Sequence, residues 1–321
     1  MTRLLRGLVS RAVYSEGAGI ARAVPQAVAV PRRPDDVVAL VRWAAAACAP
    51  LVPRGSGSGM AGGAVGDEVI VDLSRLRDMH AVDHASRRVA VGPGAIRDAV
   101  NAAAQRNGLR LPVDPSSGAF CTIGGMVATN AAGPHTLRYG SMRRWVHALD
   151  CVFADGRRAA VRRGAEPPRD VAALNRFLED VRPRIAAASH ELAASHSGVR
   201  KESSGYALRE FARSGDIVDV LVGSEGTLAV FVGVELALAP VPGATSSLLA
   251  TFSTLERAVA AAASARDADA SACELLDRTF LDVAAEGRLP AATAEAILDA
   301  GAVILAEFDL ERLLGSTPAT V

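Results

Sequence analysis

Three glycine-rich segments constrain this chain more than any other feature of its sequence. They read PRGSGSGMAGG (residues 53–63), DPSSGAFCTIGGMVATNAAG (114–133) and VGSEGTLA (222–229), and we call them the first, second and third glycine segments. Glycine costs backbone entropy, so a chain keeps clusters of it where the main chain approaches a ligand or takes positive φ. Serine and threonine interleave these glycines and add hydroxyl donors, without a lysine or a metal ligand. Such segments suit a large phosphate-bearing cofactor that lies along a long groove.

The first glycine segment contains a G-x-G-x-x-G pattern at Gly57, Gly59 and Gly62. In a Rossmann turn this pattern opens a helix, because the pyrophosphate rests on the N-terminus of that helix. Here residues 68–73 follow closely, and their alternating β-branched pattern predicts a strand. We therefore expect this loop to join strand to strand, which argues against a Rossmann-type NAD domain.

Composition narrows the function classes further. The 321 residues suffice for two domains, and the formal net charge of zero gives no electrostatic footprint for nucleic acid. Cysteines stand far apart at positions 48, 121, 151 and 273, whereas iron–sulfur and zinc sites need clustered thiolates. We therefore expect buried thiols in a reducing cytoplasm. No apolar run reaches membrane-spanning length, so we expect no transmembrane segment.

Helical and strand patterns mix along the chain without regular βαβ alternation, which favours an α+β fold. An Asp155-Gly156 turn between two strand patterns indicates a hairpin. Helices are expected from Arg33-Pro34 to about residue 44, over 95–107 and 170–195, and after a Ser253-Thr254 cap, with further helical runs beyond it. Strands are expected at 68–73, 147–153, 158–161, 230–238, 248–252 and 302–308.

The ordered motifs resemble those of the vanillyl-alcohol-oxidase-type flavoproteins, whose FAD-binding domain is also called the PCMH type. Within that superfamily the sequence is most similar to the group of the glycolate oxidase flavin subunit and D-lactate dehydrogenase. Besides the glycine segments, residues 13–44 and GAIRDAVNAAAQRNGLRLPVDPSS (94–117) carry the likeness, which spans roughly residues 13–242.

The resemblance implies an N-terminal extension (1–23), a two-lobed PCMH-type FAD-binding domain (24–242) and part of a ferredoxin-like substrate cap (243–321). The chain stops at Val321, soon after the strand expected at 302–308. We therefore expect an incomplete cap with an unpaired sheet edge, as in a fragment or a truncated gene product.

The resemblance also implies which residues contact FAD. The first glycine segment would wrap the pyrophosphate with backbone N–H groups, an anion site that needs no positive side chain. The second would line the cofactor, and the third would complete the groove. The implied residues are Pro53, Arg54, Gly55, Ser56, Gly57, Ser58, Gly59, Ser116, Ser117, Thr122, Gly124, Gly125, Thr129, Asn130, Ala131, Ala132, Glu225, Gly226, Thr227, Leu228 and Ala229.

FAD is expected to be held without a covalent bond. Some members of the family tether flavin through a histidine in an R-S-G-G-H setting, and Ser58 stands where that histidine would be. Serine does not form that link.

Other polar residues carry weaker signals. Glu225 either touches flavin or only orders its loop, and His135 either stabilises a turn or takes part in chemistry. His80 and His84 have i, i+4 spacing, but the surrounding pattern is strand–turn–strand, so we expect no metal there. Arg143 and Arg144 are interpreted as a surface charge pair.

The resemblance implies oxidation of a small 2-hydroxy acid such as D-lactate or glycolate, with hydride transfer to flavin N5. Catalytic residues stay unknown, because the sequence has no H-x-G-D-G-N-x-H-like segment, and the chain by itself is expected to show negligible turnover. Two alternatives remain: an FAD-binding fragment that needs a partner chain, and a flavoenzyme for another alcohol. Expected partners are the substrate, a chain supplying the rest of the cap, or an iron–sulfur electron-transfer protein. The expected location is the cytoplasm, with peripheral attachment to the inner membrane as an option.

Overall fold

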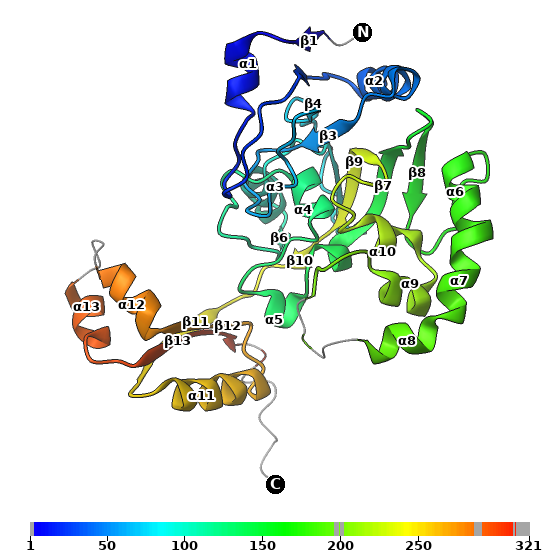
Figure 1. The fold of residues 1–321 in the computed structure, drawn as a ribbon. Helices are drawn as coiled ribbons and strands as arrows, with labels where there is room; N and C mark the ends of the chain where they lie inside the picture. Colours follow the sequence, from blue (N-terminus) through cyan, green and yellow to red (C-terminus); the bar gives the residue numbers. More distant parts are fainter. Residues whose placement is uncertain (1–2, 196–198, 200–201, 286–290, 311, 313–321) are drawn as a thin grey trace. The chain divides into compact units, whose positions relative to one another are not determined.

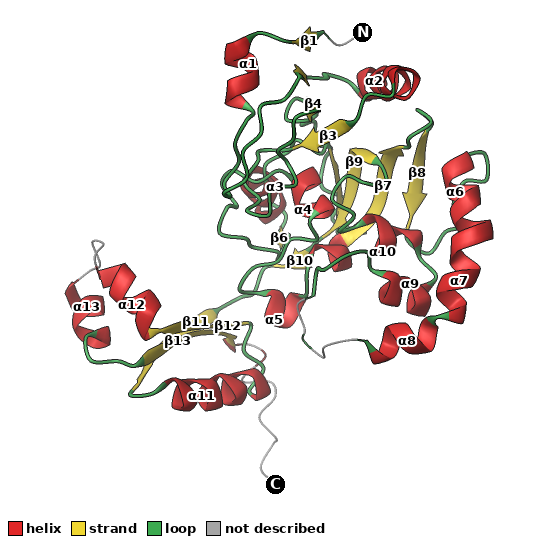
Figure 2. Cartoon of the chain, viewed as in Figure 1, coloured by secondary structure: helices red, strands yellow, loops and turns green. Residues whose placement is uncertain are grey.

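The computed structural model describes residues 3–195, 199, 202–285, 291–310 and 312. These residues pack into two compact units (Figures 1 and 2). The first unit comprises residues 1–111, 115–131 and 141–240, and the second comprises 112–114, 132–140 and 241–321. The sequence placed a boundary after residue 242, but nothing in it indicated that two short stretches from within the first 140 residues would pack with the C-terminal part.

The first sheet of the first unit has the strand order β1-β2-β4-β3. Its strands are β1 (Leu4–Leu5), β2 (Ala27–Ala29), β3 (Leu51–Arg54) and β4 (Val69–Asp72), accompanied by helices α1 (Leu8–Val13) and α2 (Pro34–Ala47). Strands β3 and β4 pair in parallel, and no helix stands between them. The prediction that the first glycine segment joins strand to strand is therefore confirmed.

Helix α2 begins where the sequence indicated. The Asp36 carboxylate accepts hydrogen bonds from the backbone N–H groups of Arg32 and Arg33, which caps the first turn. The buried side chains of Val37, Leu40 and Val41 lie at helical spacing and pack into a core with strands β2 and β4.

The second sheet of the first unit is antiparallel, with the strand order β5-β9-β7-β8. Gly156 turns the β7–β8 hairpin with φ of 73°, as the Asp-Gly pair predicted. The strands are β5 (Arg88–Val91), β7 (Val146–Val152), β8 (Arg158–Arg162) and β9 (Val230–Ala237), and β6 (Leu109–Arg110) pairs with β10 (Ala239–Pro240).

Helices surround this sheet (Figure 2). They are α3 (Arg97–Gln105), α4 (Ile123–Ala128), a 3-10 turn (Met142–Trp145), α6 (Ala172–Arg176), a π-helical turn (Phe177–Val181), α7 (Arg182–Ala187), α8 (Ser189–Ala194), α9 (Leu208–Ser214) and α10 (Ile217–Leu221). The long helical stretch expected at 170–195 is thus divided into short pieces. Helices α4, α9 and α10 were not foreseen.

The second unit contains a three-stranded antiparallel sheet with the order β11-β13-β12. Alternate residues of β13 face opposite sides: Ala302, Ile304 and Ala306 pack against α11, whereas Val303 packs against α12 and α13. Helix α11 accordingly lies on one side of the sheet, and α12 and α13 lie on the other (Figure 2). The elements are α5 (Thr136–Tyr139), β11 (Thr245–Phe252), α11 (Leu255–Asp267), β12 (Ala272–Asp277), α12 (Arg278–Ala285), α13 (Ala291–Ile297) and β13 (Ala302–Asp309).

One stretch of the second unit corrects the sequence interpretation. The sequence analysis named no strand between residues 252 and 302, but residues 272–277 form strand β12, because pairing with β13 outweighs their weak local preference. Otherwise the mixed helices and sheets confirm the predicted α+β class.

Candidate functional site

The first glycine segment leaves strand β3 and packs against the second. A Cβ atom added at Gly55 would lie 2.1 Å from Thr122 Oγ1, so only glycine fits at this approach. Further along the loop, Gly57 has φ of 73°, and its carbonyl accepts a hydrogen bond from the Ala18 N–H. The exposed hydroxyls of Ser56 and Ser58 contact each other at 3.2 Å.

Helix α4 forms within the second glycine segment because Thr122 caps it. The Thr122 hydroxyl accepts a hydrogen bond from the Gly125 N–H, which satisfies one of the free donors of the first turn. Gly124 lies so close to Pro93 that a Cβ would meet the proline ring at 2.6 Å. At the end of the helix, the Thr129 hydroxyl donates a hydrogen bond to the Gly125 carbonyl.

The third glycine segment contacts both of the others. The Gly223 N–H donates to the Val127 carbonyl, and the Glu225 N–H donates to the Ala128 carbonyl, each at 2.9 Å. A Cβ on Gly226 would lie 3.1 Å from the ring of Pro53. The structure therefore brings together, within the first unit, the first glycine segment, residues 115–131 of the second and the third glycine segment, which are separated by up to about 170 positions in sequence.

Not every residue expected to contact the cofactor enters this convergence. Ser116 is exposed, and the carbonyl of Ser117 accepts turn hydrogen bonds from Phe120 and Cys121. Ala132 belongs to the second unit, whereas Ala131 belongs to the first.

Arg54 holds the first glycine segment against neighbouring backbone. Its guanidinium donates to the carbonyls of Glu16 and Ala64 and lies over the ring of Tyr14. Burial lowers the pKa of Arg54. Burial together with a hydrogen bond to Asp72 raises the pKa of Tyr14 to about 12. The sequence analysis did not predict these contacts to Arg54 of the first glycine segment, because Tyr14 and Asp72 lie far from that segment along the chain.

A cavity of about 370 Å³ lies next to the convergence. It is lined by apolar side chains of α2 and β7, by Pro53 and by the third glycine segment from Gly226 to Ala229. Glu225 takes a left-handed conformation with φ of 52° and joins the second glycine segment through its backbone. Its side chain is exposed, so loop ordering is the role that its contacts support.

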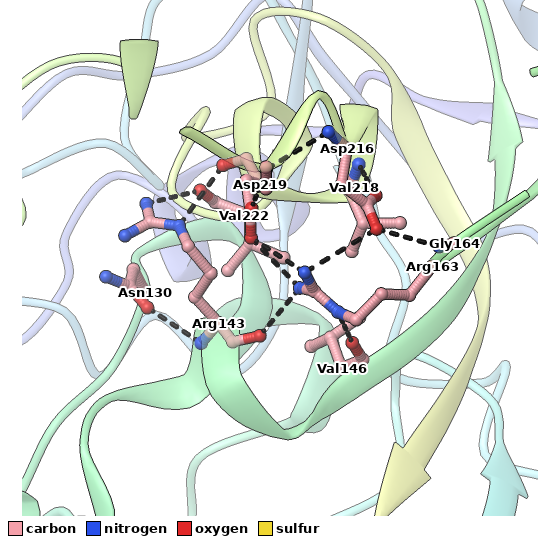
Figure 3. A network of polar contacts seen from close by, with 10 residues as sticks. Asn130, Arg143, Val146, Arg163, Gly164, Asp216, Val218, Asp219 and Val222 are labelled. Atoms are coloured by element: carbon pink, nitrogen blue, oxygen red, sulfur yellow. Dashed lines mark hydrogen bonds and ion pairs between the residues drawn. The ribbon is translucent and has the colours of Figure 1, made fainter. Parts of the chain in front are cut away.

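Two arginines join the second and third glycine segments through hydrogen bonds (Figure 3). Arg143 donates from its backbone N–H to Asn130 Oδ1 and from its guanidinium to the carbonyls of Asp219 and Val222. Arg163 donates to Asp219 Oδ1 through both terminal nitrogens and to the Arg143 carbonyl. The interpretation of Arg143 as surface charge is therefore wrong, because its partners come from distant segments; Arg144 is exposed as expected.

Two polar atoms at this convergence are buried without a hydrogen-bond partner among the described residues: Asn130 Nδ2 and Ser224 Oγ. Asn130 is 1% exposed and Ser224 is 2% exposed. Buried donors are normally satisfied, so such a pair fits a site whose ligand completes the hydrogen bonds. Close-packed glycines, backbone donors and these two groups fit an extended phosphate-bearing cofactor such as FAD.

His135 belongs to the second unit and contacts two carboxylates there. Its Nδ1 lies 2.5 Å from Asp114 Oδ2, and its Nε2 lies 2.8 Å from Glu307 Oε1. The hydrogen bond to Asp114 raises the pKa of His135, with Glu307 adding to the effect. Both ring nitrogens are thus engaged, which supports the structural interpretation of this histidine. Among the described residues no group of three His, Cys, Asp or Glu side chains is arranged to hold a metal ion.

Residues 25–161 match the family model of an FAD-binding domain. The chain is 34% identical over 245 residues to D-2-hydroxyglutarate dehydrogenase of Xanthomonas citri pv. viticola, covering 74% of this chain and 42% of that protein. It is 32% identical to D-lactate dehydrogenase of Archaeoglobus fulgidus (72% and 43% covered). It is 28% identical to glycolate oxidase subunit GlcD of Bacillus subtilis (74% and 42% covered).

A solved structure of alkyldihydroxyacetonephosphate synthase shares the fold with a TM-score of 0.71 at 16% identity, covering 98% of this chain and 56% of that one. The chain spans a little under half the length of the curated relatives described above. These matches confirm the family that the glycine segments indicated: the chain belongs to the PCMH-type FAD-binding flavoproteins, in the group of D-lactate dehydrogenase and the glycolate oxidase flavin subunit.

Proposed function

We propose that this chain is the FAD-binding part of an oxidoreductase that oxidises a small 2-hydroxy acid. The observation that carries the proposal is the convergence of the three glycine segments around two unsatisfied buried donors. The relatives named above act on D-2-hydroxyglutarate, D-lactate and glycolate, which supports this substrate class.

The cofactor and the protein have different roles in this proposal. Bound FAD supplies the hydride-accepting chemistry. The first glycine segment offers backbone N–H groups to the pyrophosphate. Arg54 keeps that loop in place through its hydrogen bonds to the carbonyls of Glu16 and Ala64. The cavity beside residues 226–229 gives an apolar surface for a planar ring.

The proposal extends to partners and location. The B. subtilis relative is named as a subunit, which supports a partner chain for this protein as well, and we propose that this partner accepts the electrons of the flavin. The four cysteines are free, which supports a reducing compartment such as the cytoplasm. Among the described residues, no helix is both long and apolar enough to cross a membrane.

Titration of the 321-residue protein with FAD tests the cofactor, by quenching of flavin fluorescence. We expect saturable binding, and acid precipitation should release all flavin into the supernatant because Ser58 cannot tether it. No binding of FAD, or flavin retained in the pellet, would contradict the respective part of the proposal.

Anaerobic addition of D-2-hydroxyglutarate, D-lactate or glycolate to the FAD-loaded protein tests the substrate class. Perturbation of the flavin spectrum by one of these acids without rapid bleaching, and no perturbation by a sugar lactone or an aromatic alcohol, is the expected result. A response to the lactone or the aromatic alcohol alone would assign another substrate class.

A further inference from the structure

We infer that Arg143 is a positioning residue that presents Asn130 Nδ2 and Ser224 Oγ as a donor pair to an acceptor group of FAD. This inference rests on the proposed function and assigns Ser224, which the motif comparison left out, to the cofactor site. Figure 3 shows the arrangement of Asn130, Arg143 and Val222 on which it depends.

Arg143 fixes the orientation of the Asn130 carboxamide. Its backbone N–H donates to Asn130 Oδ1 at 2.9 Å (Figure 3), which leaves Nδ2 as the end of the carboxamide without a partner among the described residues. Asn130 also has φ of 47°, a left-handed conformation that its neighbours must stabilise. The carboxamide is therefore held by its oxygen, and its Nδ2 donor is left without a partner among the described residues.

The guanidinium of the same residue holds the turn that carries Ser224. It donates to the carbonyls of Asp219 (3.1 Å) and Val222 (2.8 Å), and its NH2 atom lies 3.0 Å from where a Cβ of Gly223 would be. Gly223 has φ of 89°, which only glycine adopts readily. One arginine thus fixes both sides of the donor pair.

Within the described residues of the three glycine segments, only Asn130 and Ser224 have a buried side-chain polar atom without a hydrogen-bond partner. The neighbouring hydroxyl of Thr227 donates to the Ser224 carbonyl at 2.6 Å and contacts Tyr206 Oη at 2.8 Å. Ser224 Oγ and Asn130 Nδ2 have no such partner among the described residues, although both are buried. A buried donor without a partner carries a desolvation penalty, which an acceptor oxygen or nitrogen of the ligand removes.

Substitution of Ser224 separates a cofactor role from a structural one. Ser224→Ala removes an unsatisfied buried hydroxyl, so we expect the melting temperature of the FAD-free protein to stay the same or rise. The dissociation constant for FAD should increase about tenfold, which corresponds to one hydrogen bond at the upper end of its usual range. A merely structural serine would change the two quantities together.

Substitution of Arg143 tests the positioning. Arg143→Ala should weaken FAD binding by more than tenfold, because both donors lose their orientation. Arg143→Lys should recover part of that loss, because lysine keeps the positive charge. The recovery should be incomplete, because one ammonium cannot bridge the two carbonyls as the planar guanidinium does. The matched control is Arg144→Ala, an exposed neighbour of the same type, which should leave binding unchanged within twofold.

Titration with ADP locates the acceptor group. Weaker binding of both ADP and FAD by Ser224→Ala places the acceptor in the pyrophosphate half, and weaker binding of FAD alone places it in the flavin half; both support the inference. Wild-type affinity for FAD in a folded Ser224→Ala and Asn130→Ala pair overturns it. Failure of the wild type and of Arg144→Ala to bind FAD would instead overturn the proposed function.

Discussion

Two charge networks, one in each unit, hold distant segments together with different chemistry. In the first unit, the guanidinium groups of Arg143 and Arg163 meet Asp219 and several backbone carbonyls. In the second unit, His135 lies between Asp114 and Glu307, and nearby Arg138 pairs with Asp269 and Asp309. An arginine stays charged at every pH that a protein meets, whereas a histidine titrates near neutrality.

The difference teaches which contacts respond to pH. Arginine stays charged across the neutral range, so the guanidinium contacts beside the glycine segments are not expected to switch with pH. The link between Asp114, His135 and Glu307 is strongest with the imidazole protonated, because both ring nitrogens then donate. Strand β13, which carries Glu307, is thus tied to residues 112–114 and 132–140 by a titratable contact.

The largest expected effect comes from removing the fixed counterion. Asp219→Ala leaves the Arg163 guanidinium and the Ser214 hydroxyl without their carboxylate partner. Breaking a buried ion pair from one side costs about 3–5 kcal/mol. We expect a loss near the lower figure, because the Arg163 side chain is 30% exposed to solvent screening and Asp216 lies 3.7 Å from it. We expect this loss in urea unfolding, with little change between pH 6 and pH 9.

The matched control is Asp35→Ala, in which an exposed carboxylate loses a 3.7 Å contact with Arg158. It should change stability by less than about 0.5 kcal/mol. A similar result for both variants would show that the Asp219 network contributes nothing beyond surface charge.

The next effect depends on pH. Because the folded pKa of His135 is raised above the unfolded value, its contribution is fully present below about pH 6.5 and is lost as the pH rises through the folded pKa. We expect His135→Gln to cost roughly 1.5–3 kcal/mol at pH 6 and progressively less towards pH 9. Unfolding of wild type and variant across this range measures the difference.

His147 of strand β7 sharpens the comparison, because burial lowers its pKa. Its charged form is disfavoured in the fold, so the wild type should lose stability relative to His147→Gln as the pH falls through the unfolded value. The two histidine variants should therefore show opposite slopes against pH. Parallel slopes would remove the proposed role of the two carboxylates beside His135.

The smallest effects compare one helix cap in each unit. Thr122 is buried and caps α4, whereas Thr254 is exposed and caps α11 with a 3.4 Å hydrogen bond. Replacing a threonine cap by alanine typically costs ~1 kcal/mol. We expect Thr122→Ala to reach or exceed that value and Thr254→Ala to stay below it, as measured by thermal unfolding; the reverse order would contradict the importance of the tight contact with Gly55.

Local signals predicted much of the fold. Helix α2 and the β7–β8 hairpin follow from a capping carboxylate at Asp36 and a glycine at position 156. Strand β12 was missed because its pairing with β13 depends on residues about 30 positions away. Helix α4 was missed as well, although Thr122 before two glycines and an apolar run was the signal that could have revealed it.

The sequence by itself determined the family, the FAD cofactor and the three glycine segments, because each depends on residue types at fixed spacing within one short stretch. The tertiary structure decided how those segments meet, why the half-buried Arg143 binds Asp219 and Val222, and why His135 faces Glu307 across 172 positions. The physical reason is that an arginine or a histidine looks the same in a sequence whether it is solvated or paired. Only the folded chain brings the carbonyls and carboxylates that choose between these states.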